Sequence, residues 1–535
     1  MTPVLILLPI LVLFLTALGI VVLQQTRPSI GYSWLIGSLG AFAAAAIVTA
    51  MRWYLPMGIE VDAVSPFPGY SSPPSFSLDR SSWPYVFSMA VVALAFLLTD
   101  SARLETEARP LNWAAGLSLI GICMLALMAA NPVTLVLAWT AVDLVELMMV
   151  LVQGSGRRMG EQMIIAFSVR VSGTVLVLMA VLVARSQGID FTLAEIPSSL
   201  GIFMLLAAGL RLGVLPLNIP YFRDAYPWRG LGNVLRMIGP ASSLVLLGRM
   251  PAELPIADWR VLLLGLSGLA AMYGAAMFLN AENEISGRPY WFAALAGLAV
   301  ASVINGSPQA SIAWGTALIL FGSVLFFFSA RRRQILYIPV LGAIGISGLP
   351  FTPAASGWQG VIGGSAGAFS LFAIFTVVLL IWGYLRHAWR GRDELYRMER
   401  WVHTVFPVGL VILIAAGAAN GYLGWPGSRT AGVWWASITA ALIAGAGIVA
   451  ALSLRSRFDD QEIRGRWLGV FARRIGGILG AIFRLNWLYR FLAWMYSVLQ
   501  SVIQLLTTMF EGDGGILWAM VILALLISQI IAGGA

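Results

Sequence analysis

Five ionisable side chains lie inside stretches of the sequence that are otherwise apolar: Asp143, Glu146, Arg170, Arg211 and Arg236. The two carboxylates are three residues apart, a spacing that places both on one face of a helix. A carboxylate inside a membrane either pairs with a cation or takes up and releases a proton. These five residues are therefore the candidate ion pathway or buried ion cluster of the chain.

The basic members of this set are all arginine, as are all 33 basic residues of the chain. Arginine has a pKa of about 12.5–13.8, so deprotonating it at pH 7 would cost on the order of 7–9 kcal/mol. A lysine starts near about 10.4, and burial can bring it within reach of neutral pH. Arg211 and Arg236 are therefore predicted to be fixed positive charges that need anionic partners.

Three uses of the five residues stay open from the sequence. They could form a satisfied buried ion cluster, a proton half-channel through Asp143 and Glu146, or a binding site for an anion. We expect no catalytic group, no metal site and no cofactor. The single cysteine, Cys123, excludes an intrachain disulfide and a four-cysteine iron–sulfur site, and the two histidines, His387 and His403, fall near predicted helix ends.

The composition indicates an integral membrane protein. Of its 535 residues, 59% are hydrophobic and only 11% are charged, whereas soluble proteins carry about 25% charged residues. Sixteen apolar runs have about the 17–25 residues that a membrane-spanning helix needs, so the predicted fold is an all-α polytopic membrane protein. The predicted spans are 3–24, 30–51, 82–99, 112–130, 132–152, 162–184, 200–219, 231–249, 260–280, 289–305, 308–329, 335–353, 361–386, 403–424, 432–454 and 515–533.

The orientation follows from the placement of arginine. Loops after odd-numbered spans hold 24 arginines and loops after even-numbered spans hold six. Because positive residues are retained on the cytoplasmic side, both termini are predicted to lie outside a bacterial cytoplasmic (inner) membrane. The net charge of +9 is then a property of the topology, and no nucleic-acid partner is predicted.

Two predicted spans, the seventh and the twelfth, are interrupted by glycine and proline. They read "LGVLPLNIP" (212–220) and "ISGLPFTP" (346–353). Each is the fourth element of a five-helix unit, and interruptions at matching places in two halves indicate inverted repeats. The predicted repeats are 112–249 (helices 4–8) and 250–386 (helices 9–13). The helix-break residues are Gly213, Pro216, Pro220, Gly348, Pro350 and Pro353.

The rest of the chain is divided by its loops and by its hydrophobic pattern. The apolar residues between 455 and 512 recur at three- and four-residue steps among arginines, which predicts an amphipathic lateral helix on the cytoplasmic interface. In an alternative interpretation, 487–510 is a further span or a re-entrant helix. The remaining predicted parts are 1–111 (helices 1–3, with an outer loop at 53–81), 387–454 (helices 14–15) and 513–535 (a final transmembrane helix).

Four segments, taken in order, carry a resemblance to a known family. They are "FSLDRSSWPYVFSMAVVALAFLLT" (76–99), "NPVTLVLAWTAVDLVELMMVLV" (131–152), "GLRLGVLPLNIPYFRDA" (209–225) and "GISGLPFTPAASGW" (345–358). The chain resembles the antiporter-like membrane subunits of respiratory complex I (NADH-quinone oxidoreductase), of its large distal subunit type, which are related to subunits of membrane-bound hydrogenases and of multisubunit cation/proton antiporters. The resemblance implies proton translocation coupled to electron transport. It also implies that other membrane subunits and lipid are the partners.

The chain departs from that family where the family moves protons. Trp139 matches, but Thr140 stands in the place of the family's glutamate in the fifth helix. The lysine and histidine of the seventh helix are replaced by Arg211 and Asn218. Gly357 or Trp358 stands in place of the twelfth-helix lysine. These departures predict a degenerate or structural role for the chain.

Two other functions are kept as alternatives. Within the same family, the chain could be the membrane subunit of an inorganic-carbon uptake complex that works with a carbonic-anhydrase-like protein. From another class, the acidic pair Glu60 and Asp62 in the first outer loop could belong to a lipid-linked glycosyltransferase.

Overall fold

The computed structural model describes most of the chain. It forms two compact units, Met1–Phe458 and Asp459–Ala535. The described residues are 3–26, 30–61, 73–103, 109–153, 157–218, 229–328, 335–362, 368–390 and 399–457 in the first unit, and Trp494, Ser497, Val498, Gln500 and Ser501 in the second.

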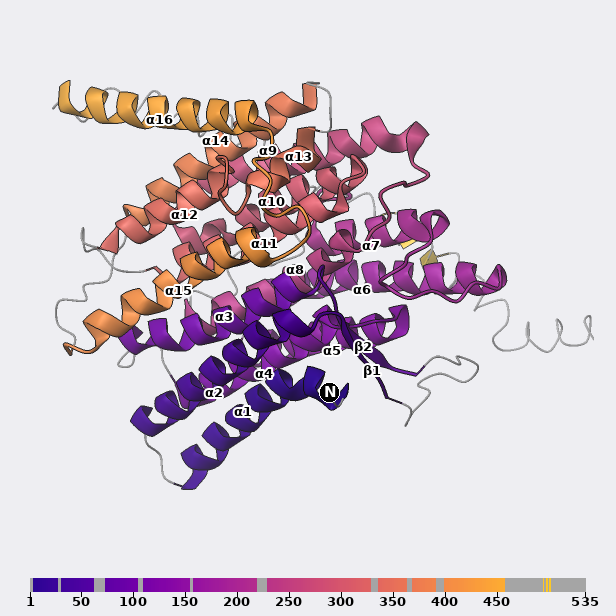
Figure 1. Cartoon of the computed structure of the whole chain (residues 1–535), viewed down its shortest axis with the longest axis horizontal. Helices are drawn as coiled ribbons and strands as arrows, with labels where there is room; N and C mark the ends of the chain where they lie inside the picture. The colour runs from indigo at the N-terminus through magenta and orange to yellow at the C-terminus, as the bar shows by residue number, and fades with distance from the viewer. Residues whose placement is uncertain are drawn as a thin grey trace, which may run out of the picture. The chain divides into compact units, whose positions relative to one another are not determined.

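The first unit is built from α-helices, so the predicted all-α membrane fold is confirmed (Figure 1). Its elements are η1 (Pro3–Leu7), α1 (Leu8–Thr26), α2 (Ile30–Met51), η2 (Arg52–Tyr54), β1 (Met57–Glu60), β2 (Ser75–Leu78), α3 (Trp83–Asp100), η3 (Ser101–Arg103), α4 (Pro110–Leu127), α5 (Pro132–Gln153), α6 (Arg157–Ser186), η4 (Ser198–Leu200), α7 (Gly201–Leu212), α8 (Gly230–Gly248), η5 (Ala257–Trp259), α9 (Arg260–Asn280), α10 (Glu284–Ile304), α11 (Pro308–Phe327), α12 (Tyr337–Ser347), α13 (Ala355–Ile362), α14 (Ala368–Ala388), α15 (Val402–Leu423) and α16 (Trp434–Arg457).

Each of the first fifteen predicted spans has a helix in the described part of the chain. Twelve of these helices are long and apolar enough to cross a membrane. Shorter apolar helices stand at the seventh, twelfth and fifteenth spans, in α7, α12 and α16. The sixteenth predicted span, 515–533, lies outside the described residues.

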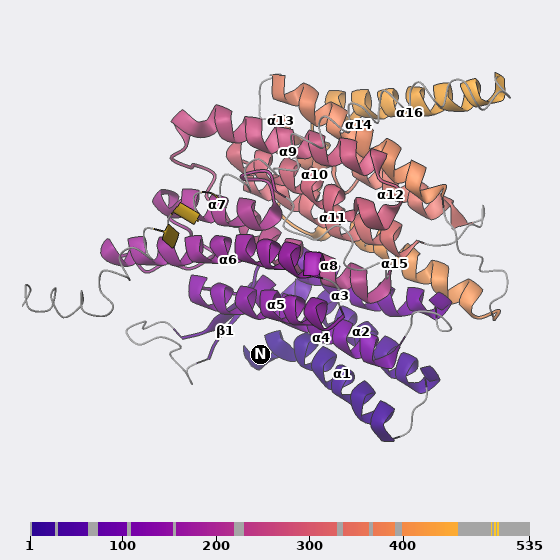
Figure 2. The ribbon, with the colours of Figure 1, turned by 180° about the vertical axis from the view of Figure 1, so that it is seen from behind.

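Four helices form the centre of the bundle. The apolar windows of α3, α8, α10 and α11 are 94–100% buried, whereas those of α1, α2, α6 and α15 are only 33–39% buried. A helix that is apolar all round and fully covered belongs in a core, whereas a half-covered one lies at the edge with one face available to lipid or protein. Seen from behind, α5, α6 and α7 lie side by side, and both α5 and α7 also pack on α8 (Figure 2).

Both interrupted spans end their first helical segment at a left-handed glycine. The C-cap of α7 is Gly213, with φ +75°, and the C-cap of α12 is Gly348, with φ +66°. A Cβ at Gly348 would lie 2.2 Å from the indole nitrogen of Trp358, so that close approach needs glycine. The two breaks thus share a local geometry, and the division into inverted repeats at 112–249 and 250–386 remains a prediction.

The outer loop predicted at 53–81 contains a small antiparallel sheet, which the sequence analysis missed. Strands β1 and β2 pair in the register Met57↔Leu78 to Glu60↔Ser75. The backbone of β2 also bonds the turn after α4, because the Ser77 amide donates to the Met128 carbonyl over 2.6 Å. Backbone groups that cover the end of a bundle need such partners, and this one is distant in the sequence.

The predicted lateral helix lies almost wholly outside the described residues. The five described residues of the second unit are helical, with Trp494 and Val498 both exposed. At its start, residues 455–457 belong to α16, which ends at Arg457. The remaining part of the 455–512 prediction, and its alternative at 487–510, stay predictions.

Candidate ion cluster

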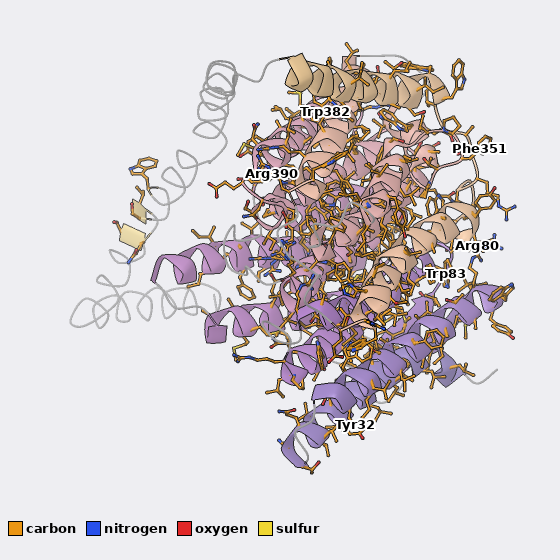
Figure 3. All side chains as sticks on the ribbon, turned by 90° about the vertical axis from the view of Figure 1, so that its left-hand side faces the viewer. Tyr32, Arg80, Trp83, Phe351, Trp382 and Arg390 are labelled. Carbon is orange, nitrogen blue, oxygen red and sulfur yellow. The ribbon has the colours of Figure 1, made fainter. Side chains whose placement is uncertain are left out.

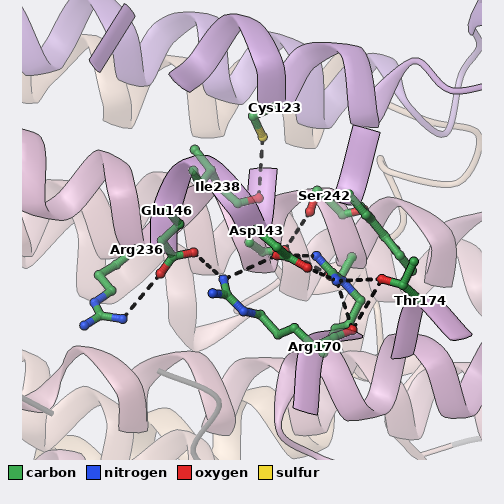
Figure 4. A network of polar contacts seen from close by, with 12 residues as sticks. Cys123, Asp143, Glu146, Arg170, Thr174, Arg236, Ile238 and Ser242 are labelled. Atoms are coloured by element: carbon green, nitrogen blue, oxygen red, sulfur yellow. Dashed lines mark hydrogen bonds and ion pairs between the residues drawn. The ribbon is translucent and has the colours of Figure 1, made fainter. Parts of the chain in front are cut away.

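The structure brings all five predicted site residues together. Helix α5 supplies both carboxylates, α6 supplies Arg170, α7 supplies Arg211 and α8 supplies Arg236 (Figure 4). Each of the five side chains is buried, with Arg211 at 0% exposure. Neutralising partners are required for charges in such a setting, because an unpaired buried ion is costly.

Arg211 and Asp143 form a bidentate ion pair in the cluster. Two guanidinium nitrogens of Arg211, Nη1 and Nη2, donate to the carboxylate oxygens Oδ2 and Oδ1 of Asp143 over 2.6 and 3.0 Å. Nη1 also donates to the Arg170 carbonyl and to Thr174 Oγ1, both at 3.2 Å, and Nε donates to Ser243 Oγ at 3.2 Å. This two-pronged geometry is specific to arginine, since lysine presents a single ammonium.

An indole and a glycine shape the space around Arg211. The guanidinium carbon lies 4.2 Å from the ring centre of Trp139, and the Trp139 indole donates to the Ser242 carbonyl over 3.1 Å. A desolvated contact of a cation with an indole face contributes about 2 kcal/mol. A Cβ at Gly173 of α6 would lie 2.7 Å from Arg211 Cγ, so only glycine leaves room for this arginine.

Arg170 occupies the middle of the cluster. Its Nη1 makes a short ion pair with Glu146 and lies 3.5 Å from Asp143 Oδ1. Glu146 also faces Arg236, whose Nη1 lies 3.5 Å from Oε1. The charges thus alternate along the row from Arg211 through Asp143, Arg170 and Glu146 to Arg236. Figure 4 shows the part of this row from Asp143 to Arg236.

This alternating row of side chains is suited to holding fixed charges in the membrane. Every second group in the row is a guanidinium, which cannot release a proton at neutral pH. Protonating either carboxylate would strand a neighbouring buried cation. Thr174, Ser243, Trp139 and Gly173 complete the site, and the sequence analysis did not place them there. For Thr174 a signal existed, because it follows Arg170 by four residues and so shares its helix face.

Thr140 lies away from the cluster. Its side chain is exposed on α5, and its hydroxyl donates to the Val136 carbonyl over 2.8 Å. The carboxylate that meets the seventh-helix cation is Asp143, one turn later. A match by sequence position therefore does not identify the residue that does the pairing.

The first helix break lies beside the cluster. Beyond the left-handed Gly213, the chain folds back so that the amides of Val214 and Leu215 both donate to the Gly209 carbonyl. Pro216 follows and has no amide hydrogen to offer. Among the described residues, no hydrogen-bond donor reaches the amide oxygen of buried Asn218. Pro220 lies outside the described residues.

The second break, at Gly348, Pro350 and Pro353, has aromatic surroundings instead of charged ones. The indole of Trp358 donates to the Ser347 carbonyl and the indole of Trp314 donates to the Gly357 carbonyl, at 3.1 and 3.0 Å. Their rings meet edge to face, 5.8 Å apart. Tryptophan and glycine thus fill the region around this break.

Further ion pairs, which the sequence analysis did not predict, lie at helix ends. Arg229 pairs with Glu284 at 2.5 Å, and Arg103 with Asp100 at 2.9 Å. Outside the spans, Arg249 pairs with Asp79 at 2.9 Å.

Two opposing effects act on the pKa of the Asp79 carboxyl, which lies outside the spans. Burial raises that pKa, but the charge of Arg249 and the amide hydrogen bonds from Ser81 and Ser82 outweigh burial and lower it below its usual range. The charged form of Asp79 is therefore favoured by the fold.

The remaining side chains that could bind a metal ion are far apart. Within the described ranges, no group of three or more histidine, cysteine, aspartate or glutamate side chains could hold a metal ion. Buried Cys123 donates to the Ile238 carbonyl at 3.6 Å. A ring nitrogen of His387 lies 2.8 Å from the Phe278 carbonyl oxygen.

Comparison with known proteins shows the fold. No family model and no curated protein matches the chain. A chain in the structure of the Mrp complex from Dietzia sp. DQ12-45-1b aligns with a TM-score of 0.72 and 16% identity, over 99% of this chain and 63% of that one. This chain therefore spans less than two thirds of the Mrp chain.

Two more solved structures are similar. One is the membrane-bound sulfane sulfur reductase, an archaeal respiratory membrane complex (TM-score 0.67, 15% identity, 97% of this chain and 99% of that one). The other is respiratory complex I from Thermus thermophilus (TM-score 0.61, 18% identity, 82% and 99%). The chain has the fold of antiporter-like membrane subunits, and the predicted resemblance is confirmed at the level of the fold.

Proposed function

We propose that this chain is an antiporter-like membrane-arm subunit of a complex I-like assembly of the NADH-quinone oxidoreductase type. It lies in a bacterial cytoplasmic membrane with both termini outside. Its partners are other membrane subunits and lipid, and it carries no redox centre of its own. Its five-residue ion cluster holds helices together and does not conduct protons.

The observation that carries this proposal is the pairing of Arg211. A group that relays protons must exchange them near neutral pH. The Arg211 guanidinium is instead held in its charged form by a bidentate carboxylate, three further acceptor groups and an indole face. The row of charges therefore supports cohesion between α5, α6, α7 and α8.

The second half of the bundle supports the same conclusion. Between Pro289 and Phe328 no residue carries a charged side chain, and this range includes most of α10 and all of α11, two of the four central helices. A proton path across the whole subunit would need exchangeable groups there. The break at α12 and α13 offers indoles in their place.

The two alternative functions differ from the main proposal in their partner proteins and in the role of the outer loop. An inorganic-carbon uptake complex would place a carbonic-anhydrase-like protein beside this chain. For a glycosyltransferase, Glu60 lies in β1 opposite Ser75, and Asp62 lies outside the described residues. Nothing in the described site favours either over the main proposal.

Isolation of the native complex tests the proposal. The chain would be tagged, extracted in a mild detergent and purified, and its stoichiometric partners identified by mass spectrometry. We expect electron-transfer subunits and other antiporter-like subunits. A carbonic-anhydrase-like partner without electron-transfer subunits would favour inorganic-carbon uptake, and a monomeric chain that binds a lipid-linked sugar would favour the glycosyltransferase.

A further inference from the structure

Three arginines come together at one end of the bundle, away from the ion cluster. Arg52 lies in η2, directly after α2, Arg80 lies in the turn before α3, and Arg429 lies in the loop after α15. Helices α2 and α15 both pack against α3, so the three side chains come from the ends of adjacent helices. We call these three residues the arginine patch.

Hydrogen bonds bring two of the three side chains to the same helix end. Nε and Nη2 of Arg52 donate to the carbonyl of Leu423, the last residue of α15, over 2.7 and 2.5 Å. Nε of Arg429 donates to the carbonyl of Tyr422, one residue earlier, over 2.8 Å. The last carbonyls of a helix have no partner within the helix, so both guanidiniums lie over the last turn of α15.

Arg80 belongs to the same patch because of its position beside Trp83. The guanidinium carbon of Arg52 lies 5.4 Å from the ring centre of Trp83, which is the first residue of α3 and follows Arg80 by three residues. The positive charges of Arg52 and Arg80 are close enough to repel each other. Arg80 is exposed and lies at the edge of the bundle in Figure 3.

The arginine patch carries positive charge that the described residues do not neutralise. Within the described ranges, no carboxylate forms an ion pair with any of its three members. Asp79, next to Arg80 in the sequence, pairs with Arg249 instead, at 2.9 Å. The acceptors that hold Arg52 and Arg429 are neutral carbonyls, so the patch is suited to an anion from outside the chain.

Aromatic side chains place the arginine patch at the level of lipid headgroups. Trp53 and Tyr54 follow Arg52 and are exposed, as is Tyr422 beneath Arg429. Tryptophan and tyrosine are enriched at the membrane–water interface. The apolar windows of α2 and α15 are each only 39% buried, so each helix leaves an apolar face open to acyl chains. The anion that a bilayer supplies at this depth is the phosphate of a phospholipid.

We propose that the arginine patch binds the headgroup of an anionic phospholipid. A guanidinium forms paired hydrogen bonds with phosphate oxygens, and three positive charges favour a lipid of net negative charge over one that carries its own cation. The carbonyl bonds of Arg52 and Arg429 hold two guanidiniums in place before the lipid binds, which lowers the entropic cost. The inference rests on the proposed function only for the membrane location, and it would stand if the chain belonged to a different complex.

Lipid binding to the purified, detergent-solubilised complex tests the proposal. The test variant combines Arg80→Gln with Arg429→Gln and leaves the bonds of Arg52 to α15 in place. The matched control combines Arg185→Gln with Arg260→Gln, because both of these arginines are exposed and the change in net charge is the same. Native mass spectrometry would count bound phosphatidylglycerol, with phosphatidylcholine as the zwitterionic comparison.

We expect the unmodified complex and the control to prefer phosphatidylglycerol. An arginine near an anionic lipid surface contributes about a fivefold gain in affinity, so the test variant should bind phosphatidylglycerol roughly thirtyfold more weakly. Lysine at both test positions keeps the charge and should restore most of the binding. Equal binding in the test and control variants, or equal binding of the two lipids, would overturn the proposal.

Two further results would assign the arginine patch to another ligand and overturn the proposal. If inorganic phosphate raised the melting temperature of the unmodified complex as much as phosphatidylglycerol does, the patch would bind a free anion. If the test variant lost a protein subunit while its bound lipid stayed unchanged, the patch would be a contact with that subunit.

Discussion

Replacing Asp143 with asparagine removes the anion from the row of charges and keeps the size of the side chain. Asp143 accepts from Arg211 at 2.6 and 3.0 Å and lies 3.5 Å from Arg170. Breaking a buried pair by removing one partner costs about 3–5 kcal/mol. Since about 1.36 kcal/mol is a factor of ten, the ratio of folded to unfolded chain should fall by roughly two to nearly four orders of magnitude.

The second substitution separates cohesion from conduction. In Asp143→Asn the guanidinium of Arg211 is stranded, and adding Arg211→Leu removes that charge. We therefore expect the double variant to recover part of the lost stability. The assay is the amount of subunit in membranes together with the melting temperature of the purified complex. The matched control, Asp190→Asn, changes an exposed aspartate and should shift stability by less than about 0.5 kcal/mol.

One result would refute this reasoning. If the Asp143→Asn complex assembled to its normal level and melted at its normal temperature, the carboxylate would not be holding the cluster together. A double variant no more stable than the single one would point the same way, because the stranded charge would then carry no cost.

Three more predictions follow from other parts of the chain. The pKa of Asp79 is lowered in the fold, so its ion pair stabilises the fold at pH values above the ordinary carboxyl pKa of about 3.9. This contribution is lost as the pH falls through the lower pKa of the folded state. Asp79→Asn should therefore destabilise the complex at pH 7 and reduce its sensitivity to acid, as measured by the melting temperature against pH. Gly173→Ala should cost about 1–3 kcal/mol by displacing the buried arginine behind it, whereas Gly265→Ala, with nothing within 4 Å of the added carbon, should not lower the melting temperature. For topology, a cysteine at Asp190 should react with an impermeant maleimide only from outside and one at Arg390 only from the cytoplasm; labelling of both from one side would contradict the orientation.

The fold was predictable because it rests on the lengths of apolar runs. A run of about 20 apolar residues has few options in a membrane other than a helix, and the first fifteen runs all became helices. The pairing of β2 with the turn at Met128 was not predictable in this way. It depends on hydrogen bonds between segments distant in the sequence, and neither segment has a strong strand pattern.

The members of the ion cluster were predictable and their arrangement was not. Charged residues in apolar runs must meet partners, which was enough to select Asp143 and Arg211. A helix that is apolar on every side carries no signal for its rotation, so nothing indicated that Arg170 would take the middle place. The same ambiguity explains why the sequence did not show that Thr140, which stands in the place of the family's glutamate, faces away from the cluster.

The proton-to-electron stoichiometry of the purified complex in proteoliposomes tests the central claim most directly. The comparison is between the unmodified complex and one carrying both Asp143→Asn and Arg211→Leu, each loaded at equal amounts of assembled complex. If the cluster is structural, both complexes move the same number of protons per electron. Fewer protons per electron in the double variant would show that the cluster is part of a proton path and would contradict its structural role.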